Sequence, residues 1–373
     1  MSRADIDAEE AAKTNSDLFR KVKQSIQTRD NATVEAVFPG RSANPENVRR
    51  VESIVNADLW GYLFPMRNSA YTYTKFLRAI AKFEGFCATY SDGRDSNAIC
   101  RKSLATMFAH FTQETGGHTP SSSVPEWRQA LVFVRESGCT EDGSGGCGYN
   151  AECSAGAWQS EVWPCGTNAD GSFKQYFGRG AKQLSYNYNY GPFSQAMFGD
   201  VHVLLNDPAL VADTWLNLAS AVYFFITPQS PKPSMLHVVD GTWVPNAHDA
   251  SLGISPGFGA TTNIINGGIE CGHGYEKPQS VNRMAYYREF ARELQVPIAS
   301  NEVLGCANQD SFDTQGSGAL LVYWDQDWAY YPNRPEGKAW ACKLVGYQTA
   351  YNALLEGDYE ACVIEYFDVQ ITQ

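Results

Sequence analysis

The stretch NAICRKSLATMFAHFTQETGG, residues 97–117, decides the fold class of this chain. Its large apolar residues recur with the i, i+3, i+4, i+7 spacing that gathers side chains on one face of a helix. These residues are Leu104, Met107, Phe108 and Phe111. Glycine readily ends a helix, and Gly116-Gly117 closes the pattern. The sequence therefore predicts a helix over 97–114 with one buried face.

A carboxylate lies on this apolar face. Glu114 follows Phe111 by three residues and Met107 by seven, so it continues the stripe. Burial disfavours an ionised carboxylate and raises the pKa of the carboxyl, which suits a general acid near neutral pH. A side chain that leaves the helix end for water is the alternative that the spacing leaves open.

The same apolar spacing predicts further helices over 208–226 and 279–294, whereas strand signals are few and short. The chain is therefore expected to be mainly α, with long glycine-rich loops.

Motif content divides the 373-residue chain into three parts. Residues 1–68 are predicted to form a helical N-terminal extension, in which Ser16 caps a short helix. Residues 69–300 hold the motifs with chemical content and are predicted to form the catalytic domain. Residues 301–373 are expected to pack on that domain as a C-terminal extension. Its aromatic run at 324–331 is expected to serve packing rather than carbohydrate contact.

Composition excludes several classes of function. The 41 acidic and 29 basic residues give a net charge of −12, which argues against a nucleic-acid partner. No run of about 18 apolar residues is present, so no membrane span is expected. The six histidines lack a metal-ligand spacing and no CxxC occurs, so we expect no metal and no cofactor. We further expect a monomer.

The ten cysteines are even in number, which favours up to five disulfides formed in an oxidising compartment. We therefore expect a secreted, extracellular protein. The first residues, MSRADIDAEEAAKTNSDLF, lack the apolar core of a signal peptide. We expect that a leader is absent from this sequence.

A second carboxylate follows the apolar run LVFV at 131–134. Glu136 comes directly after Arg135 and precedes a loop rich in glycine and cysteine, residues 138–148. Loop carboxylates stay solvated and ionised more easily than those on a helix face, which suits a general base. The alternative is an ordinary surface charge pair, which contributes little.

Four segments resemble, in the same order, motifs of family 19 glycoside hydrolases, the lysozyme-like chitinases of plants and bacteria. They are FAHFTQETGG (108–117), YFGRGAKQLSYNYNYGPF (176–193), TPQSPKPSMLHVVDGTW (227–243) and PGFGATTNIINGGIECGHG (256–274). The similarity runs from about Tyr71 to Val296, and the bacterial branch is the nearest pattern. It implies a lysozyme-like, bilobal α-helical fold with a substrate cleft between the lobes.

The resemblance also implies the activity, which is endo-hydrolysis of β-1,4-linked N-acetylglucosamine in chitin or chitooligosaccharides with inversion. Inverting enzymes hold their two carboxyl groups about 6.5–9.5 Å apart, because a water must fit between the base and the sugar. Two other functions remain open. One is lysis of bacterial cell-wall peptidoglycan, and the other is binding of chitin without catalysis.

Specific roles follow from the matched motifs. Glu114 matches the general acid, Glu136 the general base, and Ser185 a serine that helps hold the attacking water. Glu270 and Arg283 match a charged pair that organises the acid. The expected sugar-contacting residues are Trp163, Gln183, Tyr188, Asn189, Lys232 and Asn266. For the polar members of this set the alternative is structural hydrogen bonding, and for Trp163 it is core packing.

The resemblance implies two disulfides, Cys153–Cys165 and Cys271–Cys306. Proximity in the sequence then suggests the remaining three pairs, which are Cys87–Cys100, Cys139–Cys147 and Cys342–Cys362.

The chain departs from the family pattern at three places. Gln113 stands where a histidine usually precedes the acid, and Ala181-Lys182 replaces a Pro-Ile pair. The loop that carries Glu136 differs most, so the base is the less secure of the two carboxylates. Glu126 is its main rival and Glu141 the lesser one.

Overall fold

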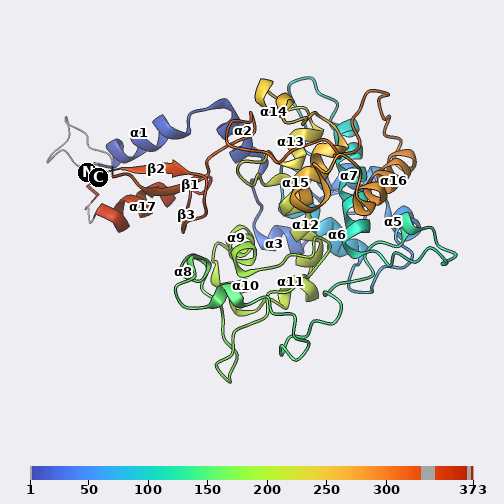
Figure 1. Cartoon of the computed structure of the whole chain (residues 1–373), viewed down its shortest axis with the longest axis horizontal. Coiled ribbons are helices and arrows are strands. Elements are labelled where there is room, and N and C mark those ends of the chain that lie inside the picture. Colours follow the sequence, from blue (N-terminus) through green and yellow to red (C-terminus); the bar gives the residue numbers. More distant parts are fainter. Residues whose placement is uncertain (1, 329–340, 368–370, 373) are drawn as a thin grey trace.

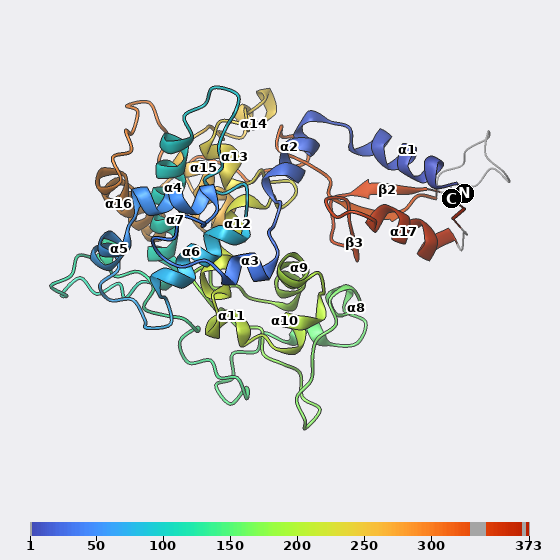
Figure 2. The ribbon, with the colours of Figure 1, turned by 180° about the vertical axis from the view of Figure 1, so that it is seen from behind.

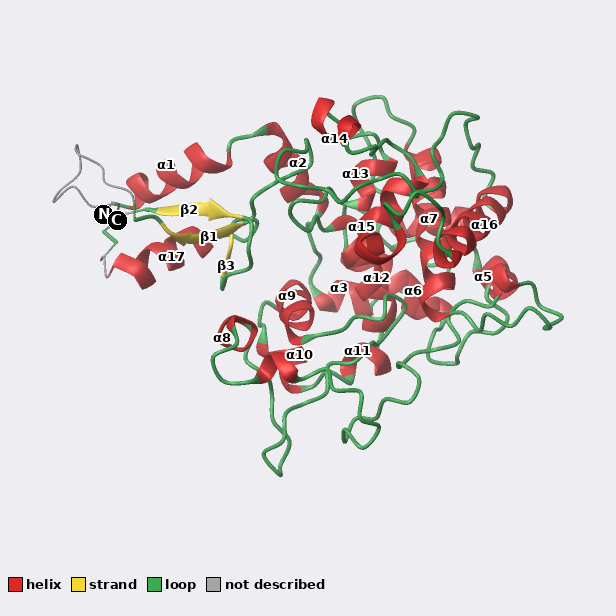
Figure 3. Cartoon of the chain, in the orientation of Figure 1, coloured by secondary structure: helices red, strands yellow, loops and turns green. Residues whose placement is uncertain are grey.

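The computed structural model describes residues 2–328, 341–367 and 371–372. Helices make up most of the regular secondary structure in the described part, and the strands form one small sheet at its edge (Figure 3). The mainly α class predicted from the sequence is therefore confirmed.

The N-terminal residues form short helices, and all of them except α4 begin at a polar side-chain cap. The Ser16 side chain accepts a hydrogen bond from the backbone N–H of Phe19, as predicted for a helix start at this point. The helices are α1 (Arg3–Thr14), α2 (Asp17–Ser25), α3 (Asn31–Glu35), α4 (Glu46–Ile54) and α5 (Ala57–Leu63).

The main body contains two groups of helices, seen above and below one another in Figure 1. The upper group comprises α6 (Tyr73–Lys82), α7 (Ser96–Thr115), α12 (Leu216–Ile226), α13 (Met235–Val239), α14 (Ala247–Ser251), α15 (Phe258–Glu270) and α16 (Pro278–Glu293). The lower group comprises α8 (Trp158–Val162), α9 (Asn187–Phe198), α10 (His202–Asn206) and α11 (Leu210–Asp213). Two short 3-10 helices, η1 (Glu126–Arg128) and η2 (Ala151–Cys153), lie in the connecting loops.

Helix α7 is the central element of the upper group and packs against α16. Phe108 on α7 meets Phe290 on α16 with ring centroids 5.6 Å apart, and it also contacts Phe64 at 5.0 Å. The buried face inferred from the sequence is thus the face that joins α7 to its neighbours.

The helix predicted over 208–226 is two helices in the structure. Thr214 has an extended backbone, and its hydroxyl accepts a hydrogen bond from the backbone N–H of Leu216 at 3.2 Å. Thr214 therefore ends α11 and separates it from α12, which the apolar spacing alone did not reveal.

A second, smaller unit lies to one side of the body, where both chain termini are found (Figures 1 and 2). Its antiparallel sheet has the order β2-β1-β3, built from β1 (Tyr323–Gln326), β2 (Cys342–Val345) and β3 (Tyr351–Asn352). Helix α17 (Asp358–Phe367) packs against β1. We refer to this sheet, the loops that join β2 to β3 and β3 to α17, α17 itself and α1 as the small unit.

The small unit has its own hydrophobic cluster. Trp324 is fully buried against Tyr359, with ring centroids 4.7 Å apart, and Ile6, Phe19 and Val22 complete the cluster from the N-terminal side. Helices α1 and α2 therefore share a core with the C-terminal residues, whereas α3, α4 and α5 contribute to the core of the main body.

The aromatic run at 324–331 behaves differently along its length. Trp324 packs in the core, whereas Trp328 is 79% exposed. Tyr330 and Tyr331 lie outside the described residues.

All five predicted disulfides are present, which are Cys87–Cys100, Cys139–Cys147, Cys153–Cys165, Cys271–Cys306 and Cys342–Cys362. Within the part of the chain that the structure describes, no helix is long and apolar enough to span a membrane.

Candidate active site

Glu114 lies in the last turn of α7, where the apolar face of the helix reaches the protein surface. Its side chain keeps 22% of its surface exposed, so it is neither fully buried nor freely solvated. Arg283 on α16 donates a hydrogen bond from Nη2 to Glu114 Oε1 at 2.5 Å. The structure thus brings together the predicted acid and the predicted arginine from elements far apart in sequence.

Arg283 is buried and joins several groups at once. It donates from Nε and Nη2 to the fully buried Glu270, at 3.0 Å to Oε2 and 2.8 Å to Oε1. Its Nη1 donates to Nδ1 of His110 at 3.1 Å. Because arginine only donates, the His110 proton is assigned to Nε2, which faces Thr261 Oγ1 at 3.0 Å. A buried arginine with two carboxylates and a neutral imidazole forms a satisfied polar cluster.

Charges control the pKa of Glu114 more than burial does. Burial alone raises the pKa of this carboxyl, but the positive charges of Arg283 and Lys182 outweigh that effect. The net result is a pKa below the ordinary value for glutamate. The pKa of Glu114 in the free protein is therefore lowered, and the raised pKa expected from the helix face was wrong, because the helix pattern alone does not include Arg283 and Lys182.

Lys182 belongs to the same surroundings. Glu114 and Lys182 both line a small cavity of about 20 Å³, together with apolar side chains such as Phe111 and Phe224. The Lys182 ammonium lies 4.4 Å from the centroid of the Phe224 ring. Burial lowers the pKa of Lys182, and the nearby Glu114 partly offsets this.

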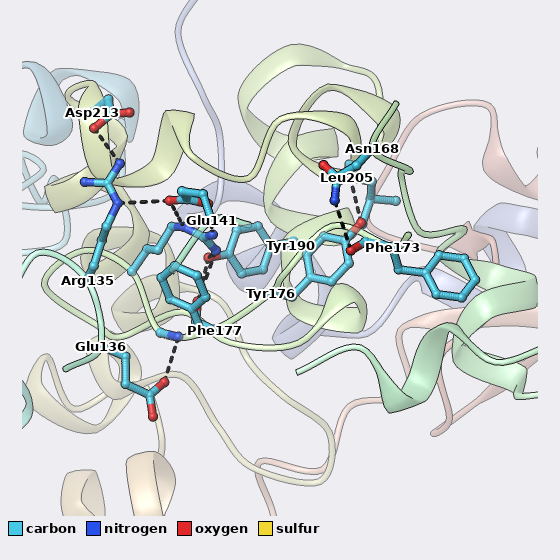
Figure 4. Close-up of polar contacts among 12 residues, drawn as sticks. Arg135, Glu136, Glu141, Asn168, Phe173, Tyr176, Phe177, Tyr190, Leu205 and Asp213 are labelled. Atoms are coloured by element: carbon cyan, nitrogen blue, oxygen red, sulfur yellow. Dashed lines mark hydrogen bonds and ion pairs between the residues drawn. The ribbon is translucent and has the colours of Figure 1, made fainter. Parts of the chain in front are cut away.

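Glu136 is positioned by backbone pairing with the segment 178–180. Its backbone N–H donates to the Gly178 carbonyl at 2.8 Å, and the Gly180 N–H donates to the Val134 carbonyl at 2.8 Å. The Glu136 carboxylate accepts from the Gly178 N–H at 3.0 Å and from the Tyr149 hydroxyl at 2.9 Å. Figure 4 shows the contact with the Gly178 backbone. Among the described residues, Glu136 has no cation partner.

The close approach at Gly178 links two predicted residues. A Cβ atom added there would lie 2.8 Å from Gln183 Oε1 and 3.3 Å from Glu136 Oε2. A side chain at residue 178 would therefore displace Gln183 and crowd the Glu136 carboxylate.

Ser185 lies in a strained turn beside this glycine. Its hydroxyl donates to the Gln183 carbonyl at 3.0 Å, and its own carbonyl accepts from Asn189 Nδ2 at 2.9 Å. Gln183 and Tyr186, on either side of it, have φ values of 55° and 71°. Such left-handed backbone is costly for residues with side chains and is concentrated at functional sites.

Four aromatic rings form a row next to Glu136. Tyr149, which bonds Glu136, meets Tyr186 at 5.0 Å between ring centroids. Tyr186 stacks on Tyr188 at 5.2 Å, and Tyr188 meets Trp158 at 6.3 Å. Trp158 is 47% exposed at the far end. We refer to Tyr149, Tyr186, Tyr188 and Trp158 as the aromatic row.

Lys232 and Asn266 both lie at α15. Lys232 Nζ donates to the Ile264 carbonyl at 2.9 Å, and burial lowers its pKa. Asn266 departs from helical geometry within α15, and its amide donates to Glu270 Oε1 at 2.8 Å. The cluster around Glu114 therefore includes Asn266 through Glu270.

Trp163 is buried, with 5% of its surface exposed. Its ring packs on Gly191, where an added Cβ would lie 2.4 Å from the ring. The indole Nε1 donates to Gln348 of the small unit at 3.1 Å. Core packing, the alternative weighed for this residue, is what the burial favours.

The two rival bases have different surroundings. Glu141 is paired with Arg135, at 2.9 Å from its Nε, and with the fully buried Arg179 (Figure 4). Burial raises the pKa of Glu141, but these arginines outweigh it and lower the pKa overall. Glu126 accepts from the Tyr286 hydroxyl at 3.1 Å and lines a cavity of about 560 Å³. Glu141 thus serves to hold its loop, whereas Glu126 stays accessible.

Sequence reasoning missed His110, Tyr149 and the position of Lys182. His110 precedes Glu114 by four residues, so helical spacing alone puts both on one face. Nothing local in the sequence indicates that Tyr149 reaches Glu136. Among the described residues, no group of three or more histidine, cysteine, aspartate or glutamate side chains is arranged to hold a metal.

The sequence of the chain is similar to those of known proteins. Residues 64–306 match the profile described as chitinase class I, of glycoside hydrolase family 19. Chitinase 12 of Oryza sativa subsp. japonica is 38% identical over 270 residues, which cover 70% of this chain and 75% of the rice protein. Endochitinase 3 of Solanum tuberosum is 38% identical over 257 residues, covering 68% of this chain and 70% of the potato protein.

Two solved structures align with about two thirds of the chain. Chitinase C from Streptomyces griseus HUT6037 is 24% identical with a TM-score of 0.47, covering 68% of this chain and 97% of that one. A bacterial family 19 chitinase is 28% identical with a TM-score of 0.48, and the alignment covers 68% of this chain and 100% of that one.

Proposed function

The chain belongs to glycoside hydrolase family 19, the class I chitinases, and from this premise we propose that it is an inverting endochitinase. Glu114 acts as general acid and Glu136 as general base. The observation that carries the assignment is the contrast between their partners. Glu114 is held by a buried arginine, whereas Glu136 is held by a backbone N–H and a tyrosine hydroxyl.

The acid step requires Glu114 in its protonated form. Arg283 and Lys182 favour the carboxylate in the free protein. A bound sugar covers the exposed part of Glu114 and removes its water, which strengthens the effect of burial and raises the pKa of the acid. Arg283 retains Glu270 as a second carboxylate partner, so it stays neutralised when Glu114 takes up its proton. Glu114 then protonates the glycosidic oxygen as the bond to the anomeric carbon breaks.

The base step is assigned to Glu136 and to Ser185. Glu136 takes a proton from a water molecule, and the water oxygen attacks the anomeric carbon on the face opposite the leaving group. The Ser185 hydroxyl, in its strained turn beside Gly178, helps to hold this water. The new reducing end therefore has the α configuration.

Substrate contact is assigned to the aromatic row and to polar side chains around it. Flat rings with a polar edge suit stacking on sugar rings. Gln183, Tyr188, Asn189, Lys232 and Asn266 are proposed to contact the N-acetylglucosamine units. Trp163 is assigned to the same region, where its burial supports an indirect contribution through packing. The substrate occupies a cleft between the two groups of helices.

Several finer assignments belong to the same proposal. We take residues 69–300 as the catalytic domain, which the matched range 64–306 supports, with extensions 1–68 and 301–373. We place the chain in the bacterial branch, because its loop around Glu136 departs most from the plant pattern. Five disulfides support a secreted, extracellular protein. The enzyme is expected to act as a monomer.

The test compares two polymers. The purified chain is incubated with colloidal chitin and, separately, with bacterial cell walls, and soluble sugar and clearing are measured. Release of chitooligosaccharides without clearing of the walls is expected. Clearing alone would replace the proposal by peptidoglycan lysis, and binding to chitin without release of sugar would replace it by a non-catalytic protein.

A further inference from the structure

Gln348 of the small unit contacts the main body at the aromatic row. Gln348 accepts a hydrogen bond at Oε1 from Trp163 Nε1, at 3.1 Å. Its Nε2 donates to the Tyr188 carbonyl at 3.2 Å. Gln348 lies beyond residues 64–306, the range that matches the family profile.

These two contacts involve the helices that bear the outer rings of the row. Trp163 caps the C-terminal end of α8, which begins with Trp158. Tyr188 is in the first turn of α9. Gln348 therefore links α8 and α9 from outside, while Asn187 links them from within by donating to the Gln159 and Trp163 carbonyls at 3.0 and 2.8 Å.

Gln348 lies in the loop that joins β2 to β3, next to Thr349, whose hydroxyl donates to the Trp324 carbonyl of β1 at 2.8 Å. In the same loop, Gly346 lies close to Ser230 of the main body. Much of the surrounding interface is open. A cavity of about 370 Å³ separates Trp163 and Tyr223 of the body from Ala350 and Leu354 of the small unit. Apolar packing between the small unit and the main body is thus incomplete here. The hydrogen bonds of Gln348 therefore contribute more to holding the two together.

We propose that Gln348 is a positioning residue that fixes the outer half of the aromatic row, and that the small unit thereby helps to bind the distal sugars of a chitin chain. The inference rests on the proposed function, since the row must stack on sugar rings. Gln348 is not proposed to touch the reacting atoms.

The experiment uses the full chain and three variants. Gln348→Met keeps the side-chain length and removes both hydrogen bonds. Gln348→Glu keeps an acceptor for Trp163 and removes the donor for the Tyr188 carbonyl. The matched control is Tyr347→Phe, in the same loop as Gln348. It removes a contact with Asp325 of β1 and leaves the Gln348 bonds in place. KM and kcat are measured with chitin hexasaccharide and with the tetrasaccharide.

The expected result is a rise in KM for the hexasaccharide with an unchanged kcat. For Gln348→Met the rise in KM is about threefold to tenfold, which corresponds to the loss of the two hydrogen bonds that Gln348 makes with Trp163 and Tyr188. Gln348→Glu shows a smaller rise, and the control matches the wild-type chain. The rise is smaller with the tetrasaccharide, because the shorter substrate reaches less of the row.

Two results would overturn the inference. One is an unchanged KM in Gln348→Met. The other is an equal loss of kcat on both substrates together with a lower melting temperature, which indicates a purely structural role. If the wild-type chain cleaves neither substrate, the proposed function fails and the inference fails with it. If the wild-type chain cleaves both substrates and Gln348→Met leaves KM unchanged, only the inference about Gln348 fails.

Discussion

The two carboxylates assigned to catalysis occupy contrasting surroundings. Glu114 ends a buried helix and shares Arg283 with Glu270, so its protonation is governed by fixed charges. Glu136 follows a short backbone pairing and is held by Gly178 and Tyr149, without a cation among the described residues. The Glu114 side chain is held by an ion-pair cluster, and the Glu136 side chain is held by neutral hydrogen-bond donors.

This difference explains how two glutamates in one protein can take opposite roles. Environment rather than residue type decides which carboxylic acid donates a proton and which carboxylate accepts one. The cluster around Glu114 can compensate the charge change when the acid is protonated, because Arg283 keeps a carboxylate partner in either state. The neutral donors on Glu136 orient its carboxylate toward water without a strong charge nearby.

The largest expected effect is that of Glu114→Gln. Loss of the acid should lower kcat on chitin hexasaccharide by about 10⁴-fold, the upper range for a general acid. The amide still accepts a hydrogen bond from Arg283, so the fold should remain intact by circular dichroism. On a dinitrophenyl glycoside, whose leaving group needs no proton, most of the activity should persist. An equal loss on both substrates would argue against the acid role.

Glu136→Gln should lower kcat by about 10²- to 10³-fold on both kinds of substrate, because water activation is needed in each case. Glu126→Gln is the matched control, since Glu126 is the main rival for the base and has a tyrosine partner of the same kind. It should retain near wild-type kcat. A large loss in Glu126→Gln with little change in Glu136→Gln would transfer the base assignment.

Arg283→Met should destabilise the protein, because Glu270 is then left fully buried without its cation. The free energy of unfolding should fall by about 3–5 kcal/mol, as when one partner of a buried pair is removed. Urea denaturation measures this, and Arg283→Met combined with Glu270→Gln is the control. The double variant should recover part of the loss. A single variant as stable as the wild type would contradict the account of this cluster.

The smallest expected effect is a displaced pH profile in Lys182→Met. The positive charge of Lys182 helps to lower the pKa of Glu114, so its removal should raise that pKa. The acid works when protonated, and kcat/KM therefore falls as pH rises through its pKa in the free enzyme. That falling limb should move to higher pH, while Lys343→Met, an exposed residue of β2, should leave it in place. An unmoved limb in Lys182→Met would show that Lys182 does not act on the acid.

Local features of the sequence were the most predictable. The apolar spacing over 97–114 identified α7 to within a residue or two, and it put Glu114 on the buried face. Disulfide pairs close in sequence were also recovered, because short loops bring their cysteines together. The helix and these disulfides both depend on residues that are close together in the sequence.

Features that depend on distant segments were predicted only where the family resemblance covered them, as for Arg283 and Glu270. The cations that lower the pKa of Glu114 come from loops and helices far along the chain, so the helix pattern indicated the wrong direction for the shift. The shared core of α1, α2 and the C-terminal sheet likewise depends on contacts across almost the whole sequence. The break at Thr214 was missed because a single hydroxyl outweighed the apolar spacing.

The central claim is the division of labour between Glu114 and Glu136 in an inverting reaction. An early-time proton NMR spectrum of chitin hexasaccharide with the protein reads the anomer at the new reducing end directly. The account predicts that the α-anomer forms first and then relaxes by mutarotation. Initial formation of the β-anomer would reveal a retaining mechanism and contradict the role of Glu136 as general base.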